Sequence, residues 1–224
     1  MRNKSTVLVL CGLLMIAAAV GLTCYNLYDS RRAGESSGEV LSDLKQYISS
    51  DPIPPSGRPG ISYRTPENEV LPSEIEYPDY VLNPDMNMPV QEINGYGYIG
   101  MLSVPTLGLE LPVMDTWDYA RLRIAPCRYT GSAYLDNMTI CAHNYNRHFG
   151  QLRNLSLGDP VVFTDMDGNV FHYQVAEVDI LQPVAIDEMT KSDWELSLFT
   201  CTVGGRTRVT VRCSREKDPL PYSG

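Results

Sequence analysis

A cysteine and a histidine that lie far apart in the sequence, Cys201 and His143, could together perform nucleophilic chemistry. His143 directly follows the β-type run 138–142 and is followed by polar residues, so we expect it at the end of a strand. Cys201 lies near the end of a second β-type run, which the turn residues Gly204 and Gly205 terminate. A thiol next to an imidazole is the arrangement that forms and resolves acyl intermediates.

An arginine is the third candidate, because the strand after the turn alternates arginine with small or β-branched residues. Arg206, Arg208 and Arg212 fall on one face of that strand by the two-residue period. Arg208 is the preferred candidate from its spacing, since both it and Cys201 stand a few residues from the turn. A guanidinium there would favour the thiolate and bind an oxygen that gains charge. The alternative is a buried cysteine beside a solvated basic strand.

The elements that must hold these residues are short β-type runs separated by turn signals, a rhythm typical of a barrel or sandwich. We expect strands near 98–104, 109–114, 139–142, 160–165, 169–180, 195–203 and 207–213, and short helices at 117–122 and 149–155. The run DMDGN (165–169) starts like a calcium loop. Its glycine comes two places too early for that loop, so we predict a hairpin turn.

The N-terminal segment is apolar and lacks the turn signals of the β-type runs. Residues 7–24 are almost wholly apolar, which is long enough for a helix that spans a bilayer. Arg2 and Lys4 precede this run, and Ala17–Ala19 would also suit a cleaved signal peptide. Because no polar segment follows those alanines, we predict an uncleaved anchor. The remaining chain is then expected on the extracellular side of the membrane.

Proline dominates the segment between the anchor and the strands. Residues 51–89 hold nine of the 16 prolines, and a short helix is expected near 38–48. We therefore divide the chain into a cytoplasmic tip and anchor (1–32), a proline-rich spacer (33–97) and a catalytic domain (98–224). The spacer is expected to be a stalk; the alternative is that residues 82–92 form a lid over the site, with Asp85 reaching Arg208.

Composition restricts the function further. With 18 Lys and Arg against 27 Asp and Glu, the net charge is −9, which argues against nucleic-acid binding. Six cysteines are too few for a disulfide-stapled mini-protein. We expect Cys127, Cys141 and Cys213 to be buried free thiols, although a disulfide between two of them stays open.

The residues around the three candidates resemble the sortase family. The run LSLFTCT (196–202) is similar to the TLxTC motif of that family, with Ser197 in place of the first threonine. The run TRVTVR (207–212) looks like the family's arginine strand, and AHN (142–144) looks like its histidine segment. The resemblance covers about residues 98–213.

This resemblance implies an all-β fold, an eight-stranded sortase-type β-barrel with short helices, preceded by the N-terminal transmembrane helix. It implies that Cys201 is the nucleophile, His143 the acid/base and Arg208 the group that positions substrate and oxyanion. Thr200 and Ala142, next to two of these residues, are expected to contact the substrate. No metal and no cofactor is implied.

The implied activity is that of a cysteine transpeptidase on the outer face of a Gram-positive membrane. It would cleave secreted proteins at a C-terminal LPXTG-like signal, between Thr and Gly, and pass the acyl group to an amine of peptidoglycan or a pilin. The connection 182–194 is short and no apolar segment follows Cys213. We therefore expect a class A-, D- or E-like enzyme rather than class B or C.

Two other kinds of protein remain as alternatives. A membrane-tethered cysteine peptidase would use the same pair but give the acyl group to water, although papain-type sites have an amide where this chain has an arginine. A non-enzymatic wall-associated ectodomain would keep Cys201 as a core thiol.

Overall fold

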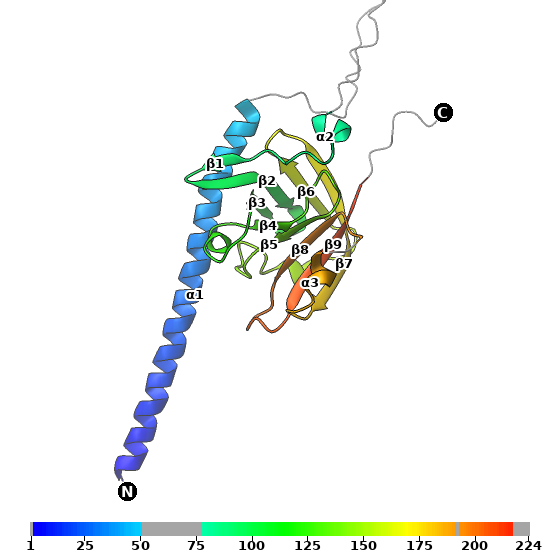
Figure 1. Ribbon diagram of the computed structural model, residues 1–224. Helices are drawn as coiled ribbons and strands as arrows, with labels where there is room; N and C mark the ends of the chain where they lie inside the picture. The colour runs from blue at the N-terminus through cyan, green and yellow to red at the C-terminus, as the bar shows by residue number, and fades with distance from the viewer. Residues whose placement is uncertain (1, 51–77, 191–192, 217–224) are drawn as a thin grey trace, which may run out of the picture.

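A closed β-barrel forms the centre of the protein, and one long helix lies against its side (Figure 1). The computed structural model describes residues 2–50, 78–190 and 193–216. The strands are β1 Gln91–Ile93, β2 Tyr96–Val104, β3 Leu109–Met114, β4 Cys127–Thr130, β5 Met138–Cys141, β6 Pro160–Asp165, β7 Val170–Leu181, β8 Leu196–Cys201 and β9 Arg208–Arg215. The helices are α1 Arg2–Ser50, α2 Asp79–Leu82 and α3 Ile186–Thr190, with single 3₁₀ turns η1 Pro105–Leu107, η2 Arg121–Arg123 and η3 Leu152–Asn154.

The barrel closes through eight of these strands. Their order is β2-β3-β4-β5-β8-β9-β7-β6, and β6 pairs again with β2. β1 adds to β2 outside the ring. The pairs β3–β4 and β5–β8 are parallel, and the other pairs are antiparallel. The expected eight-stranded barrel is confirmed.

The sequence pattern predicted most of the strands. β3 and β6 have the expected bounds, and β2, β5, β7, β8 and β9 lie within one to three residues of the expected runs. β1 and β4 were not predicted. They are three and four residues long, and β4 joins β3 through a single residue pair, Met114 with Cys127. Such short strands exist because their neighbours supply the pairing, so little local pattern marks them.

Side chains alternate between the inside and the outside of the barrel along each strand. In β8, Leu196 and Leu198 belong to the interior cluster, whereas Phe199 belongs to a second cluster on the outer face. In β5, Ile140 points inward and Cys141 outward by the same two clusters. The outer cluster is covered by α1, so the barrel buries apolar groups on both sides of this region.

Helix α1 is continuous for 49 residues, well beyond the apolar run. An 18-residue window within residues 6–48 has mean hydropathy 2.6 with none of it buried, and by length and composition this helix could cross a membrane. Further along, one face turns to the barrel and is buried at Ala33, Ser37, Val40 and Leu44. These positions recur every three to four residues, as on the packed face of an amphipathic helix.

This packing differs from the stalk that we expected between anchor and barrel. Residues 33–50 are helical and lie against the barrel, so the barrel sits beside α1 (Figure 1). The short helix expected near 38–48 is part of α1. The proline-rich residues 51–77 lie outside the described residues.

Tyr80, which comes just before the segment considered as a lid (82–92), and Met88 within that segment both pack on the barrel. The ring of Tyr80 stacks on Tyr134 at 4.7 Å and contacts Phe171 at 5.3 Å, and Met88 is buried in the barrel interior. Phe171 lies near the start of β7, whereas Arg208 pairs with the last residue of that 12-residue strand. At about 3.3 Å per residue the two ends are about 30 Å apart, so this placement does not support the lid.

The turn between β6 and β7 is a hairpin turn, as predicted. Asp165 is fully buried and its carboxylate accepts backbone N–H bonds from Asp167 and Asn169. The hydroxyl of Tyr134 donates to the same carboxylate at 2.8 Å. The carboxylate thus closes the turn with bonds from the protein itself.

Candidate active site

Two parallel strands that end at the same level, β5 and β8, lead to His143 and Cys201. In the pairing of β5 with β8, Cys141 stands opposite Phe199. The backbone N–H of Ala142 continues this pairing with a bond to the Phe199 carbonyl at 3.2 Å. Two residues further, His143 stands level with Cys201. His143 lies two residues beyond the last residue of β5, and by the outward parity of Cys141 and Phe199 we expect its backbone to be one strand spacing, about 4.8 Å, from that of Cys201.

Arg208 is on the other side of Cys201. The two residues are direct partners in the antiparallel pairing of β8 with β9, and side chains of directly opposed residues project from the same face of a sheet. The half-buried guanidinium donates to the carbonyls of Gly205 and Thr207, each at 3.1 Å. Cys201 and Arg208 are therefore paired in β8 and β9, and His143 follows the end of the neighbouring strand β5.

The turn that sets this register is the expected glycine turn. Gly204 and Gly205 have φ angles of 82° and 70°, values that side chains with a Cβ rarely adopt. The backbone N–H of Thr202 bonds to the Thr207 carbonyl at 3.0 Å, and the two threonine hydroxyls bond at 2.9 Å. A tight turn does not allow β8 and β9 to shift in register, which fixes Arg208 opposite Cys201.

The segment that carries His143 is compact. We call residues 143–150 the His143 segment. The His143 carbonyl accepts a bond from Phe149 N–H at 3.2 Å, and the Tyr145 carbonyl accepts one from Gly150 N–H at 2.9 Å. Burial and the nearby charge of Arg123 lower the pKa of His143 below its usual value of 6.5, against the opposing effect of the Asp29 carboxylate. The neutral imidazole therefore predominates at pH 7.

Thr200 and Ala142, which we expected to contact the substrate, both have buried side chains. Their exposed fractions are 3% and 6%, and Ala142 belongs to the interior cluster. The Thr200 hydroxyl donates to the Ala142 carbonyl at 2.8 Å. This bond joins β5 and β8 directly beside His143 and Cys201, so the pair holds the two strands in register.

The three arginines of the basic strand have separate environments. Arg206 is exposed and precedes β9, so it does not share a strand face with Arg208 as we expected. Arg212 is 4% exposed, and its guanidinium donates to Ser197 Oγ at 3.0 Å and to the carbonyls of Glu188 and Met189. Arg212 thus fastens α3 to the barrel. That leaves Arg208 as the arginine beside the thiol.

The other barrel cysteines are unsuited to nucleophilic chemistry. Cys127, Cys141 and Cys213 are buried free thiols, as expected, whereas Cys201 is partly exposed. Burial raises the pKa of Cys141 and Cys213 to about 12 and also raises the pKa of Cys127. These three stay protonated at neutral pH.

Sequence reasoning missed an aromatic surface next to the thiol. Phe199 shares the outward face of β8 with Cys201 and contacts Tyr129 edge to face at 5.2 Å. Tyr129 in turn stacks on Trp117 at 5.2 Å. The signal was present only as separate aromatic residues, because the three come from β8, β4 and the β3–β4 connection.

Comparison with solved structures gives sortases. The Clostridium perfringens sortase D5 transpeptidase is 20% identical, with a TM-score of 0.49 over 57% of this chain and 83% of that chain. Sortase C1 of Streptococcus agalactiae is 23% identical, with a TM-score of 0.49 over 57% and 72%. Sortase C-3 of Streptococcus pneumoniae is 19% identical, with a TM-score of 0.49 over 83% and 84%. The comparison with curated proteins gives no significant match.

The family assignment rests on the sequence model. The model of the sortase domain matches residues 102–216, which is more than half of the chain and contains His143, Cys201 and Arg208. This chain therefore belongs to the sortase family of cysteine transpeptidases.

Proposed function

We propose that this sortase cleaves an LPXTG-like sorting signal between Thr and Gly through a thioacyl intermediate on Cys201, and transfers the acyl group to an amine of the cell wall or a pilin. The observation that supports the proposal is the strand register: Cys201 pairs directly with Arg208, and His143 follows the end of the neighbouring strand β5. Secreted proteins with such C-terminal signals are its substrates.

In the first half-reaction the Cys201 sulfur attacks the threonine carbonyl. The neutral imidazole of His143 accepts the thiol proton and then donates it to the departing glycine amine as the C–N bond breaks. Arg208 leaves the Gly205 and Thr207 carbonyls to donate to the oxygen that becomes negative.

In the second half-reaction an amine attacks the thioester. His143, again neutral, removes the proton of that amine, and the thiolate leaves and is reprotonated. The energy of the original peptide bond is conserved in the thioester, so the transfer requires neither ATP nor a metal. Water is the competing nucleophile.

The aromatic surface of Phe199, Tyr129 and Trp117 supports an apolar signal as the substrate. It lies on the same outward face as the thiol and is continuous with it through β8. Leucine and proline side chains of a sorting signal would bury apolar area against these rings.

The N-terminal half of α1 would anchor the enzyme in the membrane, with the barrel on the extracellular side. The short β7–β8 connection, which carries only the five-residue α3 among its described residues, keeps a class A-, D- or E-like enzyme as our proposal.

The test uses the full chain in detergent micelles with an LPXTG-like peptide and an amine. Mass spectrometry should find the acyl group on Cys201 when the amine is omitted, and peptide–amine product in excess over free acid when it is present. Cys201→Ala should abolish both while the barrel stays folded.

The control separates the roles of the histidines. His143→Ala should lose at least ~10² in rate, the size of a lost general acid/base. His172→Ala should not, because His172 is exposed on β7. Free acid as the main product would instead indicate a peptidase, and turnover by Cys201→Ala would exclude the mechanism.

A further inference from the structure

Helix α1 contacts the His143 segment directly, beyond its apolar half. The hydroxyl of Tyr145 donates to a carboxylate oxygen of Asp29 at 2.5 Å. About two helical turns after Asp29, the Nε2 of His148 lies 3.1 Å from Ser37 Oγ. The segment that carries the proposed acid/base is therefore held by the helix as well as by the barrel.

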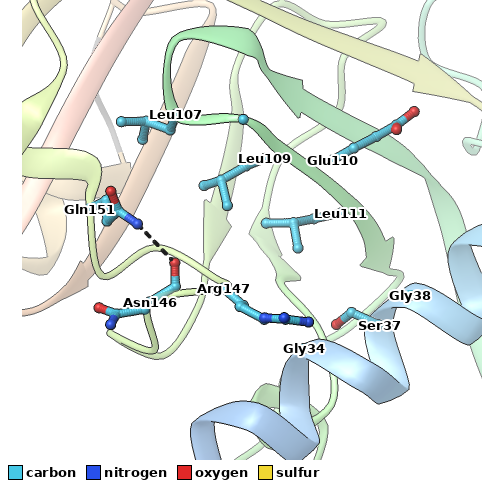
Figure 2. A pocket seen from close by; sticks show the side chains of 11 residues that line it. Gly34, Ser37, Gly38, Leu107, Leu109, Glu110, Leu111, Asn146, Arg147 and Gln151 are labelled. Carbon is cyan, nitrogen blue, oxygen red and sulfur yellow. Dashed lines mark hydrogen bonds between the residues drawn. The ribbon is translucent and has the colours of Figure 1, made fainter.

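These contacts are separated from one another, because α1 does not pack closely against the barrel along its whole length. Between α1 and the barrel there is a groove of about 340 Å³ beside Gly34 and Gly38, bordered by Leu109 and Leu111 (Figure 2). The side chain of Arg147 crosses its edge toward the helix. A Cβ at Gly34 would stand only 2.1 Å from the Cδ of Arg147, so the glycine leaves room for this approach.

Tyr145 connects the helix to the reactive imidazole. Its ring centroid lies 5.0 Å from that of His143, with a tilt of 47°. Burial and the bond to Asp29 raise the pKa of Tyr145 to about 12, so the hydroxyl keeps its proton and acts as the donor. Because the hydroxyl is tied to the helix, the face of the tyrosine ring restricts where the His143 ring can turn.

Resting on the proposed role of His143, we propose that Asp29 and Tyr145 are positioning residues for catalysis. They orient the His143 ring toward Cys201, so that the helix beyond the apolar segment is a working part of the active site. Neither residue touches the reacting atoms.

The pair acts on His143 in two separable ways. The tyrosine ring acts by contact, and the Asp29 carboxylate also acts by charge, since it opposes the lowering of the His143 pKa. The other charged or titratable groups that act on or contact His143 are Arg123 in η2 and His148 in the same segment, and Cys201 and Arg208 are expected nearby in β8 and β9. All of these stay in place when Asp29 or Tyr145 is changed, so the two effects can be measured against a constant background.

The test compares Tyr145→Phe and Asp29→Asn with the wild type as full chains in detergent micelles. Tyr145→Phe keeps the ring but frees it from the helix, so kcat should fall about tenfold with KM unchanged, as for a misplaced catalytic group. Its pH profile should stay that of the wild type, because the charge of Asp29 remains. Asp29→Asn should lower kcat and also move the acidic limb of the profile to lower pH.

Two controls separate positioning from general weakening of the interface. The double variant of Asp29→Asn and Tyr145→Phe should be no slower than the slower single variant, because both changes weaken the same bond between Tyr145 and Asp29. Glu110→Gln breaks the 2.6 Å ion pair with Lys45 at the far end of the helix interface and should keep kcat within about twofold. Additive losses, or an equal loss in Glu110→Gln, would overturn the proposal.

The same series separates this inference from the function on which it rests. If Tyr145→Phe keeps the wild-type kcat while His143→Ala is crippled, the positioning role is wrong and the proposed mechanism stands. If His143→Ala itself keeps its rate, the proposed mechanism fails and the inference fails with it.

Discussion

Buried His148 should make the protein unstable in mild acid. Its side chain is fully buried, and Ser37 Oγ donates to the Ile124 carbonyl at 2.6 Å, so the imidazole Nε2–H must donate to that hydroxyl. Among the described residues the Nδ1 atom has no hydrogen-bond partner. A proton added there would place an unpaired charge between α1 and the barrel.

The size of the effect follows from the pKa. Burial lowers the pKa of His148 from 6.5 to about 4. Below pH 6.5 the unfolded chain binds a proton that the folded protein does not accept until about pH 4, so stability falls as the pH decreases through this window. At about 1.4 kcal/mol for each pKa unit, the full loss is about 3 kcal/mol. That is a large part of a typical unfolding free energy of about 5–15 kcal/mol.

The assay is urea unfolding of the full chain in micelles at pH 7 and pH 4.5, with His148→Gln as the comparison. Glutamine can donate to Ser37 but cannot ionise, so the variant should lose about 2–3 kcal/mol less than the wild type between the two pH values. His172→Gln, which changes an exposed histidine, should behave as the wild type. An equal pH dependence in wild type and His148→Gln would refute the reasoning. If His148→Gln does not fold, the ring resonances of wild-type His148 serve instead, and a titration midpoint near 6.5 would be the contrary result.

Three further outcomes are expected. Arg208→Lys should lose ~10²–10³ in kcat, because one ammonium cannot reproduce the donors of the guanidinium, while Arg206→Lys stays near wild type; equal losses would indicate a general electrostatic surface. Arg212→Met should lower the urea midpoint, since it leaves two backbone carbonyls and a hydroxyl without their buried donor; an unchanged midpoint would contradict its role in fastening α3. A charged thiol-reactive sulfonate should modify Cys201 but spare Cys213 in the native protein, and modification of Cys213 would show that the barrel opens.

The predictable part of the fold was the part with a strong local pattern. β3 and β6 are apolar runs between clear turn signals, and the apolar half of α1 is visible from composition alone. The second half of α1 was assigned to the proline-rich spacer 33–97, with only a short helix expected near 38–48. Its helix is stabilised by burial of Val40 and Leu44 against the barrel, which no local pattern can reveal.

For the site, spacing and motif predict His143, Cys201 and Arg208, whose relative placement depends on strand register. Which side chains face the site depends on the alternation along each strand. Thr200 turns inward, although it is the immediate neighbour of Cys201. The contact between Asp29 and Tyr145 spans 116 positions of the sequence. Only the assembled barrel brings that pair together.

Because α1 is continuous from the apolar segment to the barrel, it would also set the distance between the active site and the membrane surface. Asp29 directly follows the uncharged segment 6–28 and accepts a bond from Tyr145, so this part of the His143 segment lies next to the end of the uncharged segment. With that segment in a bilayer, Asp29 and Tyr145 would lie near the lipid headgroups, and the enzyme would search a plane rather than a volume. A signal and an acceptor that are each tethered at that level meet it at a high local concentration. Soluble peptides lack this advantage, so rates measured with them understate what the enzyme achieves on a membrane.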